Sequence, residues 1–107
     1  MTKQDAFFER SKAVVDLLND QKNVGVREIE VAASAAHGAA RYSTWAFANT
    51  TLTVRELEAR KAQAIEQFTN GYREMLEEHF ADYIANYSTY YPGTPGAFTR
   101  KTGKPMP

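Results

Sequence analysis

The chain contains 107 residues, of which 43% are hydrophobic, and its 13 basic side chains balance 13 acidic ones. This length predicts one domain with a modest core, and the balanced charge creates no overall field that would attract nucleic acid or an anionic membrane. The absence of cysteine excludes disulfides, thiolate metal sites and thiol nucleophiles.

The hydropathy pattern also bears on where the protein works. No apolar stretch follows Met1, so we expect no signal peptide. No run of the sequence approaches the ~18 consecutive apolar residues of a membrane-spanning helix. We therefore expect no membrane partner and a cytoplasmic protein, or one assembled into a particle that is made in the cytoplasm.

Two helices are predicted in the first half of the chain, over residues 2–18 and 26–48, separated by a polar break that ends in Gly25. The centre of the second helix, Ala32–Ala40, consists mostly of alanine with one glycine. Small side chains let a neighbouring helix approach closely, so this stretch predicts tight packing against the third helix. A ligand slot along the same stretch is the alternative.

A third and much longer helix is predicted over residues 53–87. Thr53 and Glu56 have the spacing of a capping box, and the apolar residues that follow recur in steps of about three and four. Such a helix is about 50 Å long, which exceeds the width of a compact domain of this size. Part of its apolar stripe therefore needs a partner beyond the chain's own helices. Gly71 leaves a break at Asn70-Gly71 as an alternative, although the apolar spacing favours one continuous helix.

The last part of the chain changes in composition. Residues 91–107 contain all four prolines, three basic side chains and no acidic one. This composition predicts an extended C-terminal arm after a single α-helical domain of residues 1–90. The fold class is thus all-α, with three helices of which the third is the longest.

An acidic strip lies on the predicted third helix, where Glu74, Glu78 and Asp82 are spaced by four residues. A solvated face is the ordinary reading of such a strip. The alternative is a docking site for a basic segment, and the nearest basic segment is the protein's own arm, with Arg100 and Lys101. We expect the aromatic residues of the arm to contribute most of that binding.

No catalytic, metal or cofactor site is predicted. Helical metal sites use a Glu-x-x-His pattern, whereas Ser34 precedes His37 and Leu76 precedes His79 by three residues. Ser34 and His37 lie one turn apart, but no carboxylate is placed to orient the imidazole. We therefore expect a protein that is not an enzyme and needs no cofactor.

The pattern favours a structural or adaptor subunit of a larger homo- or hetero-oligomeric assembly, which acts through helix contacts and the docking arm. A small regulator or inhibitor of the phage or mobile-element type, which binds a target protein, is the alternative, and a small-ligand-binding bundle is the third choice. We expect a protein partner, either a second copy or another protein, and no nucleic acid. The predicted partner-binding residues are Phe80, Tyr83, Ile84, Tyr87, Tyr90, Tyr91, Phe98, Arg100 and Lys101.

Overall fold

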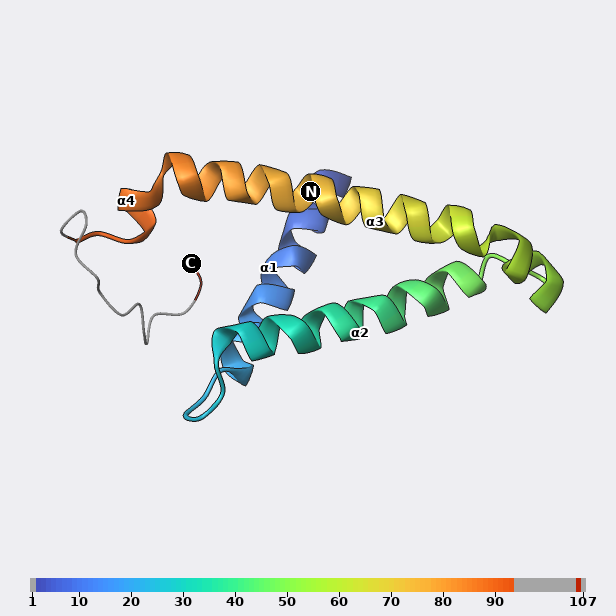
Figure 1. The fold of residues 1–107 in the computed structure, drawn as a ribbon, viewed down its shortest axis with the longest axis horizontal. Helices are drawn as coiled ribbons and strands as arrows, with labels where there is room; N and C mark the ends of the chain where they lie inside the picture. The colour runs from blue at the N-terminus through green and yellow to red at the C-terminus, as the bar shows by residue number, and fades with distance from the viewer. Residues whose placement is uncertain (1, 94–105, 107) are drawn as a thin grey trace. The chain divides into compact units, whose positions relative to one another are not determined.

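The computed structural model describes residues 2–93 and Met106. Within these residues the chain is entirely helical outside its turns and has no strand (Figure 1). The helices are α1 (Lys3–Gln21), α2 (Glu28–Ala48), α3 (Val54–Ala85) and α4 (Tyr87–Tyr90). The all-α class and the long third helix are confirmed, and the short helix α4 is an addition to the three that the sequence predicts.

The start of α1 is fixed by a reciprocal pair of hydrogen bonds. The Asp5 amide donates to the Thr2 hydroxyl at 3.0 Å, and the Thr2 amide donates to the Asp5 carboxylate at 3.0 Å. This capping box satisfies two amides that have no partner within the helix. The Thr2 hydrogen bonds hold the pKa of Asp5 below its ordinary value. The N-terminal end of α1 is therefore specified by residues that are close in sequence.

The turn between α1 and α2 depends on a glycine. Gly25 has a φ of 87°, a left-handed conformation that a side chain would strain. After the turn, the Arg27 amide donates to the Glu30 carboxylate at 3.0 Å, in the first turn of α2. The helix consequently begins at Glu28, two residues after the predicted start.

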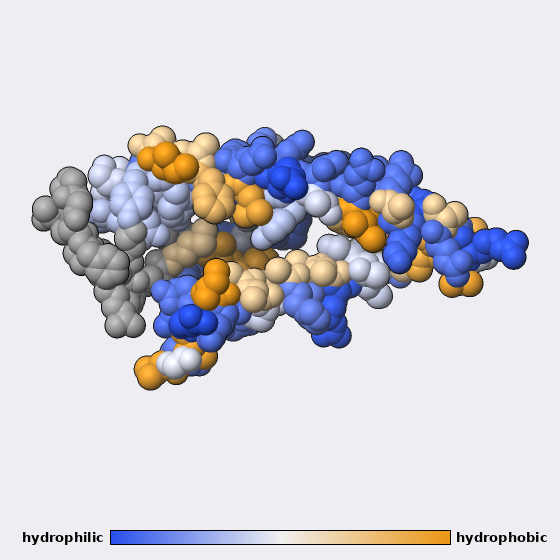
Figure 2. Space-filling view, viewed as in Figure 1, coloured by the Kyte–Doolittle hydropathy of each residue, from blue (hydrophilic) through white to orange (hydrophobic). Residues whose placement is uncertain are grey.

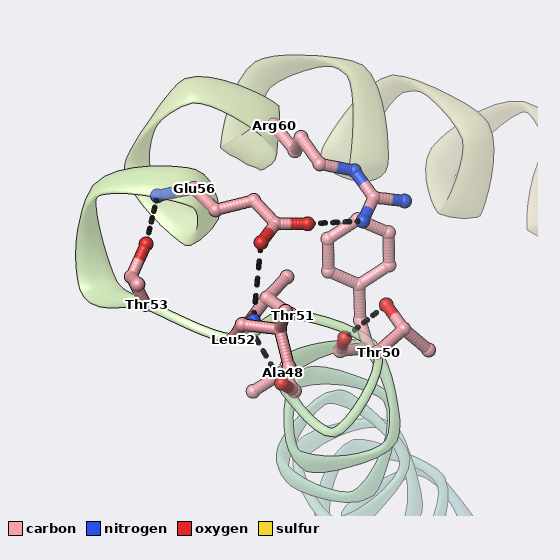
Figure 3. Close-up of polar contacts among 8 residues, drawn as sticks. Ala48, Thr50, Thr51, Leu52, Thr53, Glu56 and Arg60 are labelled. Atoms are coloured by element: carbon pink, nitrogen blue, oxygen red, sulfur yellow. Dashed lines mark hydrogen bonds and ion pairs between the residues drawn. The ribbon is translucent and has the colours of Figure 1, made fainter.

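The turn between α2 and α3 is held by side chains that cap both helices (Figure 3). The hydroxyl of Thr51 donates to the last carbonyl of α2, that of Ala48, at 2.8 Å. Thr53 is the N-cap of α3, and its hydroxyl accepts from the Glu56 amide at 3.1 Å. The Glu56 carboxylate accepts from the Leu52 amide at 3.1 Å instead of the Thr53 amide, so the predicted capping box is completed one residue earlier.

Helix α3 continues through Asn70 and Gly71, as the apolar spacing favours. A Cβ atom on Gly71 would meet no atom of the described residues within 4 Å, so packing among them does not require a glycine there. The helix ends at Ala85, two residues before the predicted end, and its C-cap Asn86 has a φ of −117° and a ψ of 29° that depart from helical values. Helix α4 then begins at Tyr87.

The chain forms two units that divide between Ala46 and Phe47. The first contains α1 and most of α2, and within it Asn19 exchanges two hydrogen bonds with the backbone of Met106, at 3.0 and 3.1 Å. The second contains the turn of Figure 3, α3 and α4. The single domain that the sequence predicts for residues 1–90 stays a prediction. Residues 94–105, which hold most of the predicted arm, lie outside the described residues.

Burial is sparse throughout the described part of the chain, where only Val31 and Ala64 are buried. Ala32, Ala36 and Ala39 are exposed, and the close helix contact predicted over them stays a prediction. None of the described helices combines the length and the hydropathy that a membrane crossing requires. Twenty large hydrophobic residues are each at least 39% exposed: Phe7, Phe8, Val14, Leu17, Val24, Ile29, Tyr42, Trp45, Leu52, Val54, Ile65, Phe68, Tyr72, Met75, Leu76, Phe80, Ile84, Tyr87, Tyr91 and Met106.

The hydroxyl of Thr53 is expected to contribute measurably to the stability of the protein. Thr53→Ala removes the acceptor of the Glu56 amide and should lower the free energy of unfolding by about 0.5–2 kcal/mol. Chemical denaturation would measure this change. Ser11→Ala, at an exposed position inside α1, is the matched control and should have little effect. Equal stability of the Thr53 variant and the wild type would show that the cap is dispensable.

Candidate interaction surface

The α3 helix presents most of its apolar residues to solvent. Among them are Val54, Ile65, Tyr72, Leu76 and Phe80, which all lie on one side of the helix and are all exposed. Figure 2 shows apolar side chains at the molecular surface along this helix. We call these five residues the α3 apolar face. Exposed apolar area of this extent is typical of a surface that binds another protein.

The N-terminal half of α3 is partly covered from within its own unit. The ring of Phe47 lies edge-on to that of Phe68, with 6.5 Å between centroids. The guanidinium of Arg60 lies 4.7 Å from the centre of the Phe47 ring and 3.5 Å from the Glu56 carboxylate. Ala64 is buried in the same half of the helix. Most residues of the α3 apolar face lie to one side of these contacts, which therefore leave them exposed.

The C-terminal half of α3 has less cover. Phe80 is 65% exposed and Ile84 is 75% exposed, and both were predicted as partner-binding residues from the sequence. Leu76 and Tyr72 are exposed on the same helix but were not among the predicted residues. The helical period places them in the same row as Phe80, but it does not show which residues of that row are left exposed.

Four tyrosine rings lie close together at the junction of α3 and α4. The rings of Tyr83 and Tyr90 stack with centroids 4.2 Å apart and planes 9° from parallel. Tyr91 lies 5.0 Å from Tyr87 and 6.4 Å from Tyr83, measured between ring centroids. We call these residues the tyrosine cluster. All four were predicted to bind a partner, and this stays a prediction. In the structure their rings pack against one another where α4 contacts the end of α3.

The carboxylate of Asp82 connects α3 to α4 through two hydrogen bonds. It accepts from the Tyr90 hydroxyl at 2.5 Å and from the Asn86 side-chain amide at 2.8 Å. The Tyr90 hydrogen bond, followed by that of Asn86, holds the pKa of Asp82 below its ordinary value. The same hydrogen bond raises the pKa of Tyr90, because its hydroxyl proton is needed for the bond.

The rest of the acidic strip lies in solvent, where Glu74 and Glu78 are exposed. Docking of the arm onto this strip stays a prediction, since Phe98, Arg100 and Lys101 lie outside the described residues. The described residues contain no group of three or more His, Asp or Glu side chains that could hold a metal ion.

The comparison with protein families places the chain in DUF3144, a family described as protein of unknown function, which matches residues 7–84. The chain belongs to this family. The matched range covers α1 from Phe7, all of α2, and α3 as far as Ile84. Neither the curated proteins nor the solved structures include a significant match.

The link between Asp82 and Tyr90 is expected to depend on pH at both ends of the scale. The depressed pKa of Asp82 gives stability that is present above its ordinary value of 3.8 and lost as the pH falls through the folded pKa. The raised pKa of Tyr90 gives stability that is present below 10.0 and lost as the pH rises through the folded pKa. Helix α4 should therefore be held most firmly between about pH 4 and pH 10.

The variant Tyr90→Phe isolates this hydrogen bond, because it keeps the ring that stacks on Tyr83. We expect the pKa of Asp82 to rise toward its ordinary value in the variant, as followed by NMR titration of the carboxyl carbon. Tyr42→Phe, on the exposed side of α2, is the control and should leave that pKa unchanged. A titration of Asp82 that is the same in both variants would contradict this assignment.

Proposed function

We propose that the protein is a non-enzymatic structural or adaptor subunit of a larger assembly, and that it binds its partner through the α3 apolar face and the tyrosine cluster. One observation supports this proposal above the others. Twenty large hydrophobic side chains are exposed in the described part of the chain, whereas two residues there are buried. Monomeric soluble proteins rarely expose apolar patches larger than a few hundred Å².

The energetics of folding lead to the same proposal. Ordering the backbone costs about 1–2 kcal/mol for each residue, and burial of apolar side chains supplies most of the compensation. The two buried residues in the described part of the chain supply very little of it. We infer that a partner surface supplies part of the missing burial, which would couple the folded state of this subunit to assembly.

The chemistry of the surface supports a protein partner. Aromatic residues, tyrosine above all, are enriched where proteins bind one another, because they offer a large area together with a polar tip. The tyrosine cluster and the nearby Phe80 provide such a surface at one end of α3. The proposed work needs neither a catalytic residue nor a cofactor, and we propose that it takes place in the cytoplasm.

Light scattering on the purified protein tests the proposal. A subunit of an assembly should have a mass well above the 12.0 kDa of one chain, or should reach such a mass when its partner is added. Removal of residues 91–107 would reveal whether the arm contributes. A stable monomer that forms a complex only with one target protein would favour the regulator. A stable monomer with no protein partner would contradict the proposal.

A further inference from the structure

The exposed apolar residues of α3 recur at a spacing of eleven. Val54, Ile65 and Leu76 are separated by eleven residues each, which is close to three helical turns. Their exposed fractions lie between 40% and 71%. A row with this period stays on one side of a nearly straight helix over its whole length. The α3 apolar face is therefore suited to a straight, extended partner such as another helix.

The arrangement of this face is self-complementary. Consider two copies of α3 that lie antiparallel, with the two-fold axis passing beside residues 70 and 71. Ile65 of each copy then lies beside Leu76 of the other. In the same register Phe80 of each copy comes close to Ala62 of the other, so a large side chain meets a small one. A two-fold axis repeats every contact, as in most homodimers.

The charges beside the face favour the same orientation. Glu66 and Arg73 are seven residues apart, which is close to two turns, so they lie on the same side of the apolar face. In an antiparallel pair, the flank on a given side of the apolar face lies beside the same flank of the other copy. This arrangement places Glu66 of each copy near Arg73 of the other. Neither side chain has an ion-pair partner among the described residues.

A parallel pair would meet an electrostatic penalty. Residues 73–82 contain one arginine and the acids Glu74, Glu77, Glu78 and Asp82, a net charge of −3. Parallel helices would place this segment at the same height in both copies. Antiparallel helices place it opposite residues 59–68, which contain Arg60, Lys61 and Glu66 and carry a net charge of +1. Charges of this kind set the orientation of paired helices.

The area of the face suits a pair of chains. Its five large side chains, each about half exposed, present roughly 500 Å², and a standard interface buries about 800 Å² from each partner. Polar and small neighbours such as Thr69 and Ala62 add to this area. The α3 apolar face alone thus supplies most of one standard interface.

We propose that α3 pairs with α3 of a second copy in antiparallel orientation, centred near residues 70 and 71, with Ile65 beside Leu76 and Glu66 beside Arg73 across the two-fold axis. This inference rests on the proposed function, because it names the partner of the same surface. It adds that the partner is this chain itself, and it gives the orientation and the register.

Disulfide cross-linking tests the register without interference, because the natural chain has no cysteine. Ile65→Cys and Leu76→Cys are made separately, oxidised alone, and oxidised as an equal mixture. In the proposed pairing equivalent cysteines are about 16 Å apart, too far for a disulfide, whereas the two different cysteines are adjacent. We expect at least about tenfold more cross-linked dimer from the mixture than from either variant alone. Gln67→Cys, on the other side of the helix, is the control and should not cross-link.

A charge reversal tests the orientation independently. Glu66→Arg alone and Arg73→Glu alone each place like charges together across the axis, and each should weaken the dimer by about tenfold. The double variant restores opposite charges and should recover the affinity of the wild type. Within one helix the two residues are about 10 Å apart along the axis, so recovery identifies a contact between copies. Sedimentation at several concentrations and low salt measures all four proteins.

The outcomes separate this inference from the proposed function. Cross-linking of each variant with itself, or a double variant as weak as the single ones, overturns the antiparallel pairing while self-assembly stands. A chain that is monomeric alone but assembles with another protein overturns self-pairing and leaves the proposed function intact. A monomer at every concentration with no protein partner overturns both.

Discussion

Glutamate at both Leu76 and Phe80 is expected to dissociate the proposed assembly. Both side chains are exposed in the described chain, so the substitutions remove little packing within it. Full burial of a Leu or Phe side chain against a partner contributes about 1.5–3 kcal/mol, and 1.4 kcal/mol corresponds to a tenfold change in affinity. The dissociation constant should therefore rise at least about a hundredfold, and light scattering should report a mass of 12.0 kDa.

A matched control distinguishes loss of the apolar face from added charge. Gln63→Glu with Gln67→Glu adds the same two negative charges to the opposite side of α3, where both residues are exposed. This variant should keep the mass of the wild type. If the variant with Leu76 and Phe80 replaced also keeps that mass, the α3 apolar face does not take part in assembly.

Dilution is expected to lower the melting temperature of the wild-type protein. When folding is coupled to assembly, a hundredfold dilution reduces the stability of a dimer by about 2.7 kcal/mol. For a dimer of this size each kcal/mol corresponds to about 2–4 °C, so the melting temperature should fall by about 5–10 °C. Circular dichroism at 222 nm in cells of different path length would measure this shift.

The same experiment on the double glutamate variant provides the control. Since that variant is expected to be monomeric at every concentration used, its melting behaviour should be independent of concentration, with less helix than the wild type. A wild-type melting temperature that does not change over a hundredfold range would show that the chain folds without a partner. The energetic argument for assembly would then be wrong.

The sequence by itself determined where most helices begin and which class of fold they form. Thr53 and Glu56 predict the start of α3, because the capping hydrogen bonds join residues that are three or four apart. The apolar spacing predicts that α3 continues through Gly71, and the structure confirms this. Such features depend on interactions between residues that are close in sequence, so the sequence pattern is enough to predict them.

The exposed face of α3 was only partly predictable. The sequence indicated that the apolar stripe is longer than the chain can cover, and Phe80 and Ile84 are indeed exposed. It did not single out Tyr72 and Leu76, because a helical period shows which residues share a face but not which of them a neighbour covers. That division follows from packing of groups such as Phe47 and Phe68, which are far apart in sequence.

Only the tertiary structure decided how the third helix ends. The sequence pattern continues to Tyr87, whereas α3 ends at Ala85 and α4 packs against it through Tyr83 and Tyr90. The hydrogen bond from Tyr90 to Asp82 joins residues eight apart that a continuous helix would separate by about 12 Å. Its formation depends on the backbone departing from helical values at a single residue, and neither helical period nor residue type specifies that departure. Local hydrogen bonds thus fixed the ends of the helices, and contacts between separate elements decided which side chains remain exposed.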